Sequence, residues 1–266
     1  PNEQGSAMID YHGKTALVTG AASGIGRALA LALSARGAEL ILVDVNEAGL
    51  AETAAQSASR AQMIIADLSD PAAPSMVLEQ AIAASGLPDL ICSNAGVAPA
   101  RRLIREKAED NGGRLFAVNV FAGLYFAQAY AEILKQSNSQ GRLLLTGSEN
   151  SLSVPAGVEA MGIGLYASTK AALLMLAEWM RAEFAGRVPI DMHILLPGAV
   201  TSGLNDGGTV DPAVATLSFI PAAQCAATAL KGMDLGLFYI PTHKHLADDM
   251  RPRLRGIEEA ITALKL

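Results

Sequence analysis

Tyr166 and Lys170 are the residues whose types and spacing most directly suggest chemistry. On a helix, positions i and i+4 share a face, so the lysine ammonium would lie beside the phenol. A positive charge there stabilises the phenolate and lowers the tyrosine pKa from ~10, which makes tyrosine a usable acid and base nearer neutral pH. The same pair is also common on helix surfaces without a catalytic role. Ser148, Ser151 and Ser153 precede it, and each is a candidate partner for the tyrosine.

A group of glycines lies where a first strand passes into a first helix. The segment "LVTGAASGIGRAL" places Gly20, Gly24 and Gly26 in this turn. Gly20 allows the tight bend, Gly24 lets the backbone approach a pyrophosphate, and Gly26 lets helix and strand pack closely. The N–H groups and the helix dipole then favour phosphate charge. Glycines mark many ordinary turns, so the strand-to-helix context carries this prediction of a dinucleotide site.

Two aspartates follow the next two strands. Asp44 is placed to bind both ribose hydroxyls of an adenosine and to repel a 2′-phosphate. Since no Arg or Lys lies in the glycine loop before Gly26 or within two residues after Asp44, the sequence favours NAD(H) over NADP(H). Asp67 is a candidate for the adenine amino group, with an ordinary helix N-cap as its structural alternative.

The elements that must position these residues alternate along the chain. Apolar runs typical of buried strands occupy 14–20, 38–44, 61–67, 88–94, 141–147 and 189–198. Helical segments such as 26–37, closed by Gly37, and 171–184 lie between them. This alternation predicts an α/β fold of the Rossmann type, with a parallel sheet covered on both faces. Residues 1–8 are interpreted as a vector remnant ahead of a native Met8, and 9–266 as a single domain whose C-terminal helical tail is interrupted by Pro252.

Composition narrows the functional classes. Hydrophobic residues make up 51% and charged residues 17%, which is too apolar for a disordered chain. The net charge of −6 argues against nucleic acid or an anionic membrane surface as partner. No apolar stretch approaches the ~20 residues of a membrane helix, and no Cys/His spacing suggests a metal site. With Cys92 expected in the core and no disulfide framework, the sequence predicts a cytoplasmic protein.

Several short motifs occur in an order that resembles the short-chain dehydrogenases/reductases. They are "TGAASGIG", "SNAG" at 93–96, "AVN" ending at Asn119, "LLLTGS", "YASTK" and "LLPGAVTS", and they span about 14–239. The resemblance implies a doubly wound seven-stranded parallel sheet in the order 3-2-1-4-5-6-7 and a homotetramer or homodimer. It also implies hydride transfer between a small-molecule alcohol or ketone and a nicotinamide cofactor.

The resemblance implies a catalytic tetrad of Asn119, Ser148, Tyr166 and Lys170. The serine would hold the substrate oxygen, and Tyr166 would transfer its proton. Lys170 would bind the nicotinamide ribose and tune Tyr166, while Asn119 would hold a water that links Lys170 to solvent. The implied cofactor-binding residues, besides Tyr166 and Lys170, are Gly20, Ser23, Gly24, Ile25, Gly26, Asp44, Asp67, Leu68, Asn94, Ala95, Gly96, Pro197, Gly198, Val200 and Ser202. Thr201 is the second choice for the role of Ser202.

The serine assignment depends on which feature is aligned. The family's usual serine-to-tyrosine separation selects Ser153, whereas its strand ending in two small polar residues selects Ser148. A loop tolerates inserted residues at little entropic cost, but moving the serine off the strand end would displace it by many ångströms. We therefore predict Ser148, with Ser151 and Ser153 in a lengthened, apolar loop. Glu149 and Asn150 either line the pocket or face solvent.

The segments expected to border the pocket, 147–165 and 199–222, hold no Lys, Arg or His. They suit a neutral, largely apolar secondary alcohol or its ketone. A phosphorylated substrate would need an arginine or lysine, and only Arg101 and Arg102 are candidates for binding it. The alternatives are a nucleotide-binding regulator without turnover and a lyase or epimerase. Gly112 and Gly113 predict a late or irregular helix start before Asn119, and His243 and His245 are expected at the surface.

Overall fold

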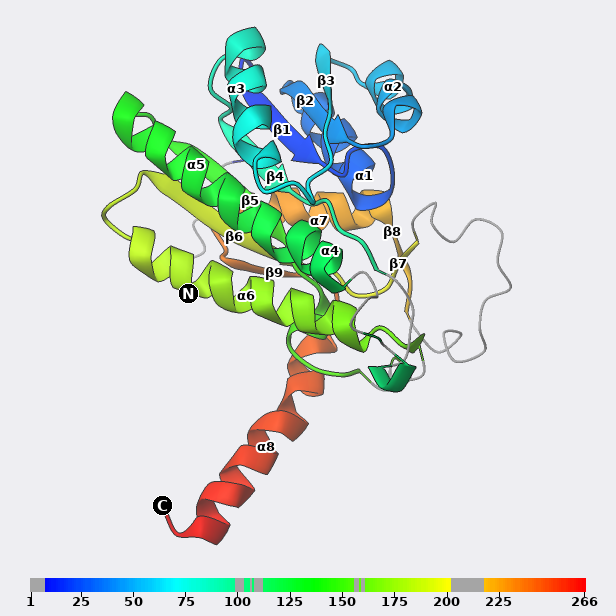
Figure 1. Ribbon diagram of the computed structural model, residues 1–266, viewed down its shortest axis with the longest axis vertical. Helices are drawn as coiled ribbons and strands as arrows, with labels where there is room; N and C mark the ends of the chain where they lie inside the picture. The colour runs from blue at the N-terminus through cyan, green and yellow to red at the C-terminus, as the bar shows by residue number, and fades with distance from the viewer. Residues whose placement is uncertain are drawn as a thin grey trace.

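Seven parallel strands form one sheet, and helices cover both of its faces (Figure 1). The computed structural model describes residues 8–98, 103–105, 107, 112–155, 158, 161–201 and 218–266. In their order across the sheet, the strands are β3 (Ala61–Ile65), β2 (Glu39–Asp44), β1 (Thr15–Thr19), β4 (Leu90–Ser93), β5 (Gly141–Thr146), β6 (Ile190–Leu196) and β9 (Tyr239–Pro241). The predicted strand order is confirmed, with β9 in seventh place.

The helices divide into two layers. One layer holds α1 (Gly24–Ala35), α2 (Glu47–Gln56) and α7 (Ala222–Asp234), and the other holds α3 (Ala73–Ser85), α5 (Ala122–Ser137) and α6 (Gly164–Phe184). Successive strand residues point to opposite layers: Leu17 of β1 belongs to one core, and Ala16 and Val18 belong to the other. Because both faces are covered, the strands are continuously apolar.

The strand β3 departs from this pattern. Met63 is 43% exposed and Ile65 is 57% exposed, so the prediction that every strand is buried on both faces is wrong here. β3 lies at the edge of the sheet, where only β2 pairs with it. An edge strand has fewer neighbours to cover its side chains, and an apolar sequence alone does not distinguish it from a central strand.

The helix that leads into α5 is continuous but irregular. It begins as α4 (Gly112–Phe116), widens to a π-helical turn over Ala117–Phe121 and continues as α5. The predicted irregularity next to Asn119 is therefore confirmed. This stretch is also long and apolar enough to cross a membrane, contrary to the expectation from sequence, but 56% of its most apolar window is buried within the fold, as in a core helix.

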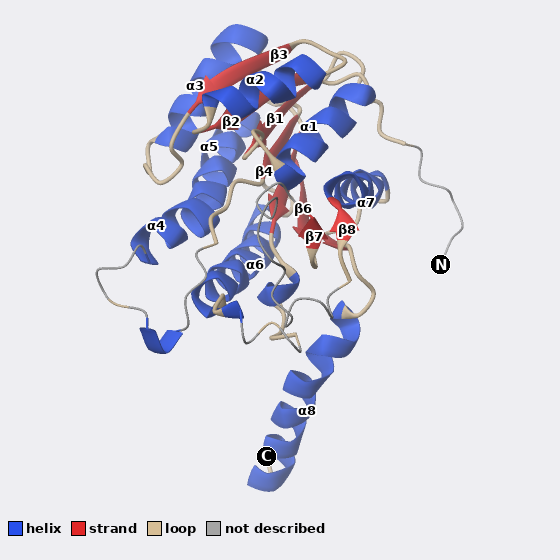
Figure 2. Ribbon diagram, turned by 90° about the vertical axis from the view of Figure 1, so that its right-hand side faces the viewer, coloured by secondary structure: helices blue, strands red, loops and turns tan. Residues whose placement is uncertain are grey.

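The C-terminal tail forms one helix, α8 (Leu246–Leu264), which projects away from the sheet in both views (Figures 1 and 2). The predicted interruption at Pro252 is wrong, because the helix continues through it. A proline removes one backbone hydrogen bond, and because this part of the helix is exposed, water can bind the carbonyl that is left without a partner. The small remaining pair, β7 (Val200–Thr201) and β8 (Ile220–Pro221), lies beyond β6.

Candidate active site

The predicted site residues follow the carboxyl ends of β1 to β6 or lie on the helices that come next. In a parallel sheet these strand ends meet at one edge, which is where open α/β proteins bind ligands. Ser202 lies outside the described residues, as do Arg101, Arg102 and positions 202–217 of the segment expected to border the pocket.

The glycine loop has a geometry that side chains could not adopt. A Cβ on Gly26 would lie 2.0 Å from the carbonyl oxygen of Gly20, and Gly20 has a φ of +67°. The Ser23 side chain makes no capping hydrogen bond to α1, which leaves the first N–H groups of that helix directed at a ligand. Ile25 is half-buried beside this loop. The cradle fits a pyrophosphate on the N-terminus of α1.

The Asp44 carboxylate is attached to this loop. It accepts hydrogen bonds from the N–H groups of Ala22 and Asn46, each at 3.1 Å. Arg27 directly follows Gly26 of the glycine loop, and its guanidinium is already bound to Glu52 at 2.8 Å and to Thr53 at 3.0 Å. The end of β2 therefore presents a fixed carboxylate beside the glycine loop.

The Asp67 carboxylate stabilises a turn and does not cap a helix. Its carboxylate accepts the N–H and hydroxyl of Ser69 at 3.0 and 2.8 Å and pairs with Arg114 at 3.0 Å. The backbone hydrogen bond from Ser69 is the main reason that the pKa of Asp67 is lowered. The N-cap alternative is wrong, since α3 is preceded by Ala72. The neighbouring Leu68 side chain is buried in the core.

Thr19 joins the ends of β1 and β4. Its hydroxyl accepts the N–H groups of Asn94 and Ala95 at 2.9 and 3.0 Å, and its carbonyl accepts the Asn94 amide at 3.2 Å. The amide oxygen of Asn94 in turn accepts the Thr146 hydroxyl at 3.2 Å. These bonds fix the Asn94–Gly96 segment against the glycine loop.

Asn119 lies in the π-helical turn and is almost completely buried. Its amide exchanges two hydrogen bonds with the backbone of Val97, at 2.8 and 2.9 Å, and donates to the Thr169 hydroxyl at 3.0 Å. A Cβ on Gly96 would lie 3.3 Å from Oδ1 of Asn119 and 3.5 Å from Nζ of Lys170. Asn119, Lys170 and the turn after β4 are thus brought together.

Lys170 is buried, with 3% of its surface exposed. Its ammonium donates to the carbonyl of Thr146 at 2.7 Å and lies 5.7 Å from the centre of the Tyr166 ring. Burial lowers the pKa of Lys170 to about 8, because the charged amine has lost its water. The predicted helix face holding both residues is confirmed.

Ser148 is the serine that meets Tyr166. Burial raises the pKa of the Tyr166 phenol, and a hydrogen bond from Ser148 opposes this rise. The Ser148 oxygen accepts the N–H and side-chain amide of Asn150 at 3.2 and 3.3 Å, which leaves its own proton to donate. Ser151 instead accepts the N–H of Ser148 at 3.2 Å in a reciprocal cap of the short turn over Glu149–Ser151. This geometry favours Ser148 over Ser153.

The balance of effects on Tyr166 differs from the prediction. Burial raises the pKa of Tyr166, the Ser148 hydrogen bond lowers it, and the negative charge of Glu149 raises it. The pKa of Tyr166 is therefore raised overall, whereas the sequence predicted that it is lowered beside Lys170. Desolvation dominates because the phenol oxygen is enclosed by protein, and the lysine proton is directed to Thr146 rather than to the phenol.

Glu149 is buried behind the serine and contacts a partly exposed histidine. Its carboxylate lies 2.9 Å from Nε2 of His245, and the Glu149 N–H donates to Pro197 at 2.8 Å. A Cβ on Gly198 would lie 2.7 Å from this carboxylate and 2.5 Å from His243. His243 is itself buried, with Nε2 2.9 Å from the carbonyl of Ser218. The expectation of a surface histidine is wrong for His243, whereas the His245 side chain is 41% exposed. Of the two alternatives for Glu149, the solvent-facing one is wrong, since its side chain is 7% exposed.

Sequence reasoning missed Thr19, Thr146 and the Glu149–His245 pair. A signal existed for the threonines, because "LVTG" and "LLTG" repeat one pattern at the ends of β1 and β5. None existed for the ion pair, whose members lie far apart in the chain. Pro197 and Gly198 follow β6, the Gly198 N–H donates to Thr242 at 3.0 Å, and Val200 is half-buried in β7.

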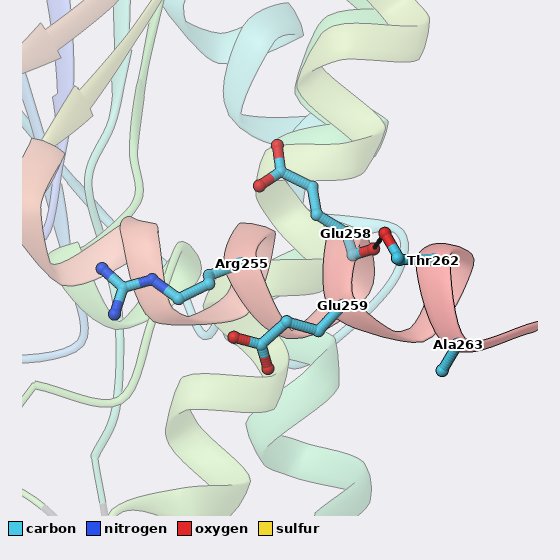
Figure 3. A pocket seen from close by; sticks show the side chains of 5 residues that line it. All are labelled: Arg255, Glu258, Glu259, Thr262 and Ala263. Carbon is cyan, nitrogen blue, oxygen red and sulfur yellow. Dashed lines mark hydrogen bonds between the residues drawn. The ribbon is translucent and has the colours of Figure 1, made fainter.

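Two other features lie away from this chemistry. A shallow hollow on α8 is lined by Arg255, Glu258, Glu259, Thr262 and Ala263 (Figure 3), none of which belongs to the site. Across the described part of the chain, no three His, Cys, Asp or Glu side chains gather as a metal-binding group.

Known proteins match this chain over most of its length. A family model described as "short chain dehydrogenase" matches residues 14–210. The 1-deoxy-11-beta-hydroxypentalenate dehydrogenase of Streptomyces avermitilis is 34% identical over 86% of this chain and 84% of its own. A short-chain dehydrogenase/reductase from Burkholderia phymatum, solved in complex with NAD, has a TM-score of 0.83 and 25% identity over 95% of this chain and 97% of its own. A short-chain dehydrogenase from Sphingobium yanoikuyae, solved with NADPH, has a TM-score of 0.74 and 25% identity over 95% of each chain.

Proposed function

Because this chain belongs to the short-chain dehydrogenase family, we propose that it is an NAD(H)-dependent oxidoreductase that interconverts a neutral, largely apolar secondary alcohol and its ketone. The convergence of Ser148, Tyr166 and Lys170 at the end of β5 carries this proposal. The Streptomyces relative also has a hydroxylated compound in its name.

The protein's own groups have distinct roles in this reaction. Ser148 donates its one proton to the substrate oxygen, in place of the hydrogen bond that it makes to the phenol without substrate. Tyr166 takes the hydroxyl proton during oxidation and returns it during reduction. Lys170 holds positive charge beneath the phenol as the proton leaves, and Asn119 fixes the turn that carries Gly96. The Thr146 carbonyl keeps the lysine in place.

The glycine loop and Asp44 would hold the nicotinamide dinucleotide, which supplies hydride acceptance and donation when bound. Gly20, Gly24 and Gly26 would approach the pyrophosphate, and Asp44 would bind the adenosine ribose. Solved relatives hold NAD in one case and NADPH in another. The preference for NAD therefore depends on the carboxylate of Asp44 and on the engagement of Arg27 by Glu52.

The substrate class is proposed from the described part of the pocket wall. Pro155 and Val158 are buried there, and Met161, Ile163 and Leu165 are half-buried. Cys92 and Cys225 are both free and buried, which suits a reducing compartment such as the cytoplasm. We also propose that the protein forms a homo-oligomer, either a homotetramer or a homodimer.

The test is steady-state reduction of NAD⁺ and NADP⁺ with a panel of hydrophobic secondary alcohols. Tyr166→Phe should remove activity while cofactor binding persists. Asp44→Asn keeps a hydrogen-bond acceptor for the loop but removes the charge, so the NAD⁺ to NADP⁺ preference should fall ~10–100-fold, the scale of one or two charged hydrogen bonds. Equal activity of wild type and Tyr166→Phe would refute the assigned chemistry, and an unchanged preference in Asp44→Asn would refute the cofactor assignment.

A further inference from the structure

The C-terminal helix α8 is a long helix with little of the fold against it. Leu246 is its buried anchor, and every residue from Met250 to the C-terminus is exposed. Pro252 and Gly256 both lie inside the helix and weaken it. An isolated helix of this length is marginal in water even with favourable residues, so α8 needs a partner surface to be stable.

The exposed apolar residues of α8 follow a heptad. They are 42% to 69% exposed and lie at alternating spacings of four and three: Met250, Leu254, Ile257, Ile261 and Leu264. This is the spacing of the a and d positions of a coiled coil, which form one narrow seam along a helix. The side chains drawn in Figure 3 lie off this seam and are mostly polar. The helix therefore carries an apolar stripe that suits a second helix.

The charges of α8 are ordered in blocks along its length. Asp248 and Asp249 lie in the first turn, Arg251, Arg253 and Arg255 form a central basic block, and Glu258 and Glu259 form an acidic block after it. Arg251 lies 3.0 Å from Asp248 of its own helix. Two copies of this helix running in opposite directions would place each basic block against an acidic block. The same alignment sets Leu254 against Ile257 of the partner subunit, and Arg251 near Glu258 of the partner subunit. Apolar layers and charges are thus satisfied by one register.

The antiparallel direction of this pairing also suits the position of the folded body. The folded body lies at the N-terminal end of α8 (Figures 1 and 2). An antiparallel pair puts the two bodies at opposite ends of a seam about 28 Å long, the length of a 19-residue helix. A membrane surface is a poorer occupant, because helices that lie on membranes carry an excess of Lys and Arg, whereas α8 balances Arg with Asp and Glu and the whole chain carries −6.

We propose that α8 is an interaction surface for a second copy of this chain, and that the two helices pair as an antiparallel coiled coil. This pairing is independent of the proposed reaction. It adds an interface beyond any contact that the folded bodies make with each other.

The first test is the mass of the full-length protein in solution, measured by sedimentation velocity over a range of concentrations. Leu254→Glu combined with Ile257→Glu should halve the mass of the assembly. Thr262→Glu combined with Ala263→Glu, on the other side of the same helix, should leave the mass unchanged. Equal masses for wild type and the seam variant would overturn the proposal. So would loss of the assembly in the Thr262 and Ala263 control.

The second test gives the direction of pairing. A mixture of Leu254→Cys and Ile257→Cys chains should form an interchain disulfide several-fold faster than either variant alone, because the antiparallel register sets position 254 against position 257. The native cysteines are buried and do not compete. Faster cross-linking within each single variant would overturn the antiparallel arrangement. Co-sedimentation of wild type, but not of the seam variant, with phosphatidylserine-containing vesicles, together with an unchanged mass, would assign α8 to a membrane instead.

Discussion

Replacing Lys170 by methionine tests whether burial of the Lys170 ammonium in the proposed site lowers the free energy of unfolding. The pKa of Lys170 falls from 10.5 to about 8 on folding, and one pKa unit corresponds to about 1.4 kcal/mol. Holding the protonated amine in the interior at pH 7 therefore costs the folded state about 3 kcal/mol. Methionine has a similar length and no charge, so Lys170→Met removes this cost.

The sign of the pH dependence follows from proton binding. Between pH 8 and 10.5 the unfolded chain keeps the proton on Lys170 and the folded chain has released it. The unfolded state then binds more protons, so the free energy of unfolding rises with pH across this window. Between pH 7 and 9.5 the contribution of Lys170 amounts to about 2 kcal/mol, or about 4 °C in Tm for a chain of this size.

The measurement is urea or thermal unfolding of wild type and Lys170→Met at both pH values and one protein concentration. The difference between the two proteins isolates the lysine, because the tyrosines and cysteines that titrate at high pH are present in both. The absolute stability of the variant also includes the lost bond to the Thr146 carbonyl, which the pH comparison removes. Parallel stability curves for the two proteins from pH 7 to 9.5 would refute the reasoning.

Two matched pairs of substitutions test the serine assignment and the glycine loop. Ser148→Ala should lower kcat/KM ~100–1,000-fold, the usual cost of losing one hydrogen-bond donor to the reacting oxygen. Ser153→Ala should change kcat/KM less than ~3-fold. The reverse order of the two effects would assign the catalytic role to Ser153. Gly26→Ala should destabilise the fold by about 3 kcal/mol or more and abolish cofactor binding measured by calorimetry, since the new Cβ would lie 2.0 Å from the Gly20 carbonyl. Gly113→Ala, where nothing lies within 4 Å, should instead raise stability by about 0.5–1 kcal/mol. Stabilisation by both alanines in thermal unfolding would contradict the described loop.

Local patterns predicted much of the fold and part of the site. Each of the six apolar runs contains a strand of the sheet, because short runs of this kind suit strands covered by helices on both faces, although β3 at the edge is exposed on one side. Ser148 was identifiable because it directly follows the end of its strand. The strand end stays at the same edge of the sheet whatever the length of the loop that follows. The i and i+4 relation of Tyr166 and Lys170 needed only a helix.

Features set by distant contacts were not predictable in this way. The exposure of Ile65 depends on which strand occupies the edge of the sheet, and the sequence of that strand does not encode its neighbours. The raised pKa of Tyr166 depends on how many protein atoms surround its oxygen, and on a carboxylate at 149 that folding brings into the interior. The burial of Glu149 depends in turn on His245, which only the folded chain places beside it.

The contact between Glu149 and His245 ties the beginning of the C-terminal helix to the end of β5. His245 is the residue directly before α8, and the Glu149 N–H donates to the Pro197 carbonyl at 2.8 Å, just after β6. One residue beside Ser148 therefore connects three segments: the serine turn, the loop after β6 and the base of the helix that we propose to pair with a second copy. The orientation of α8 on the folded body is thus anchored at the same edge of the sheet that carries the proposed chemistry.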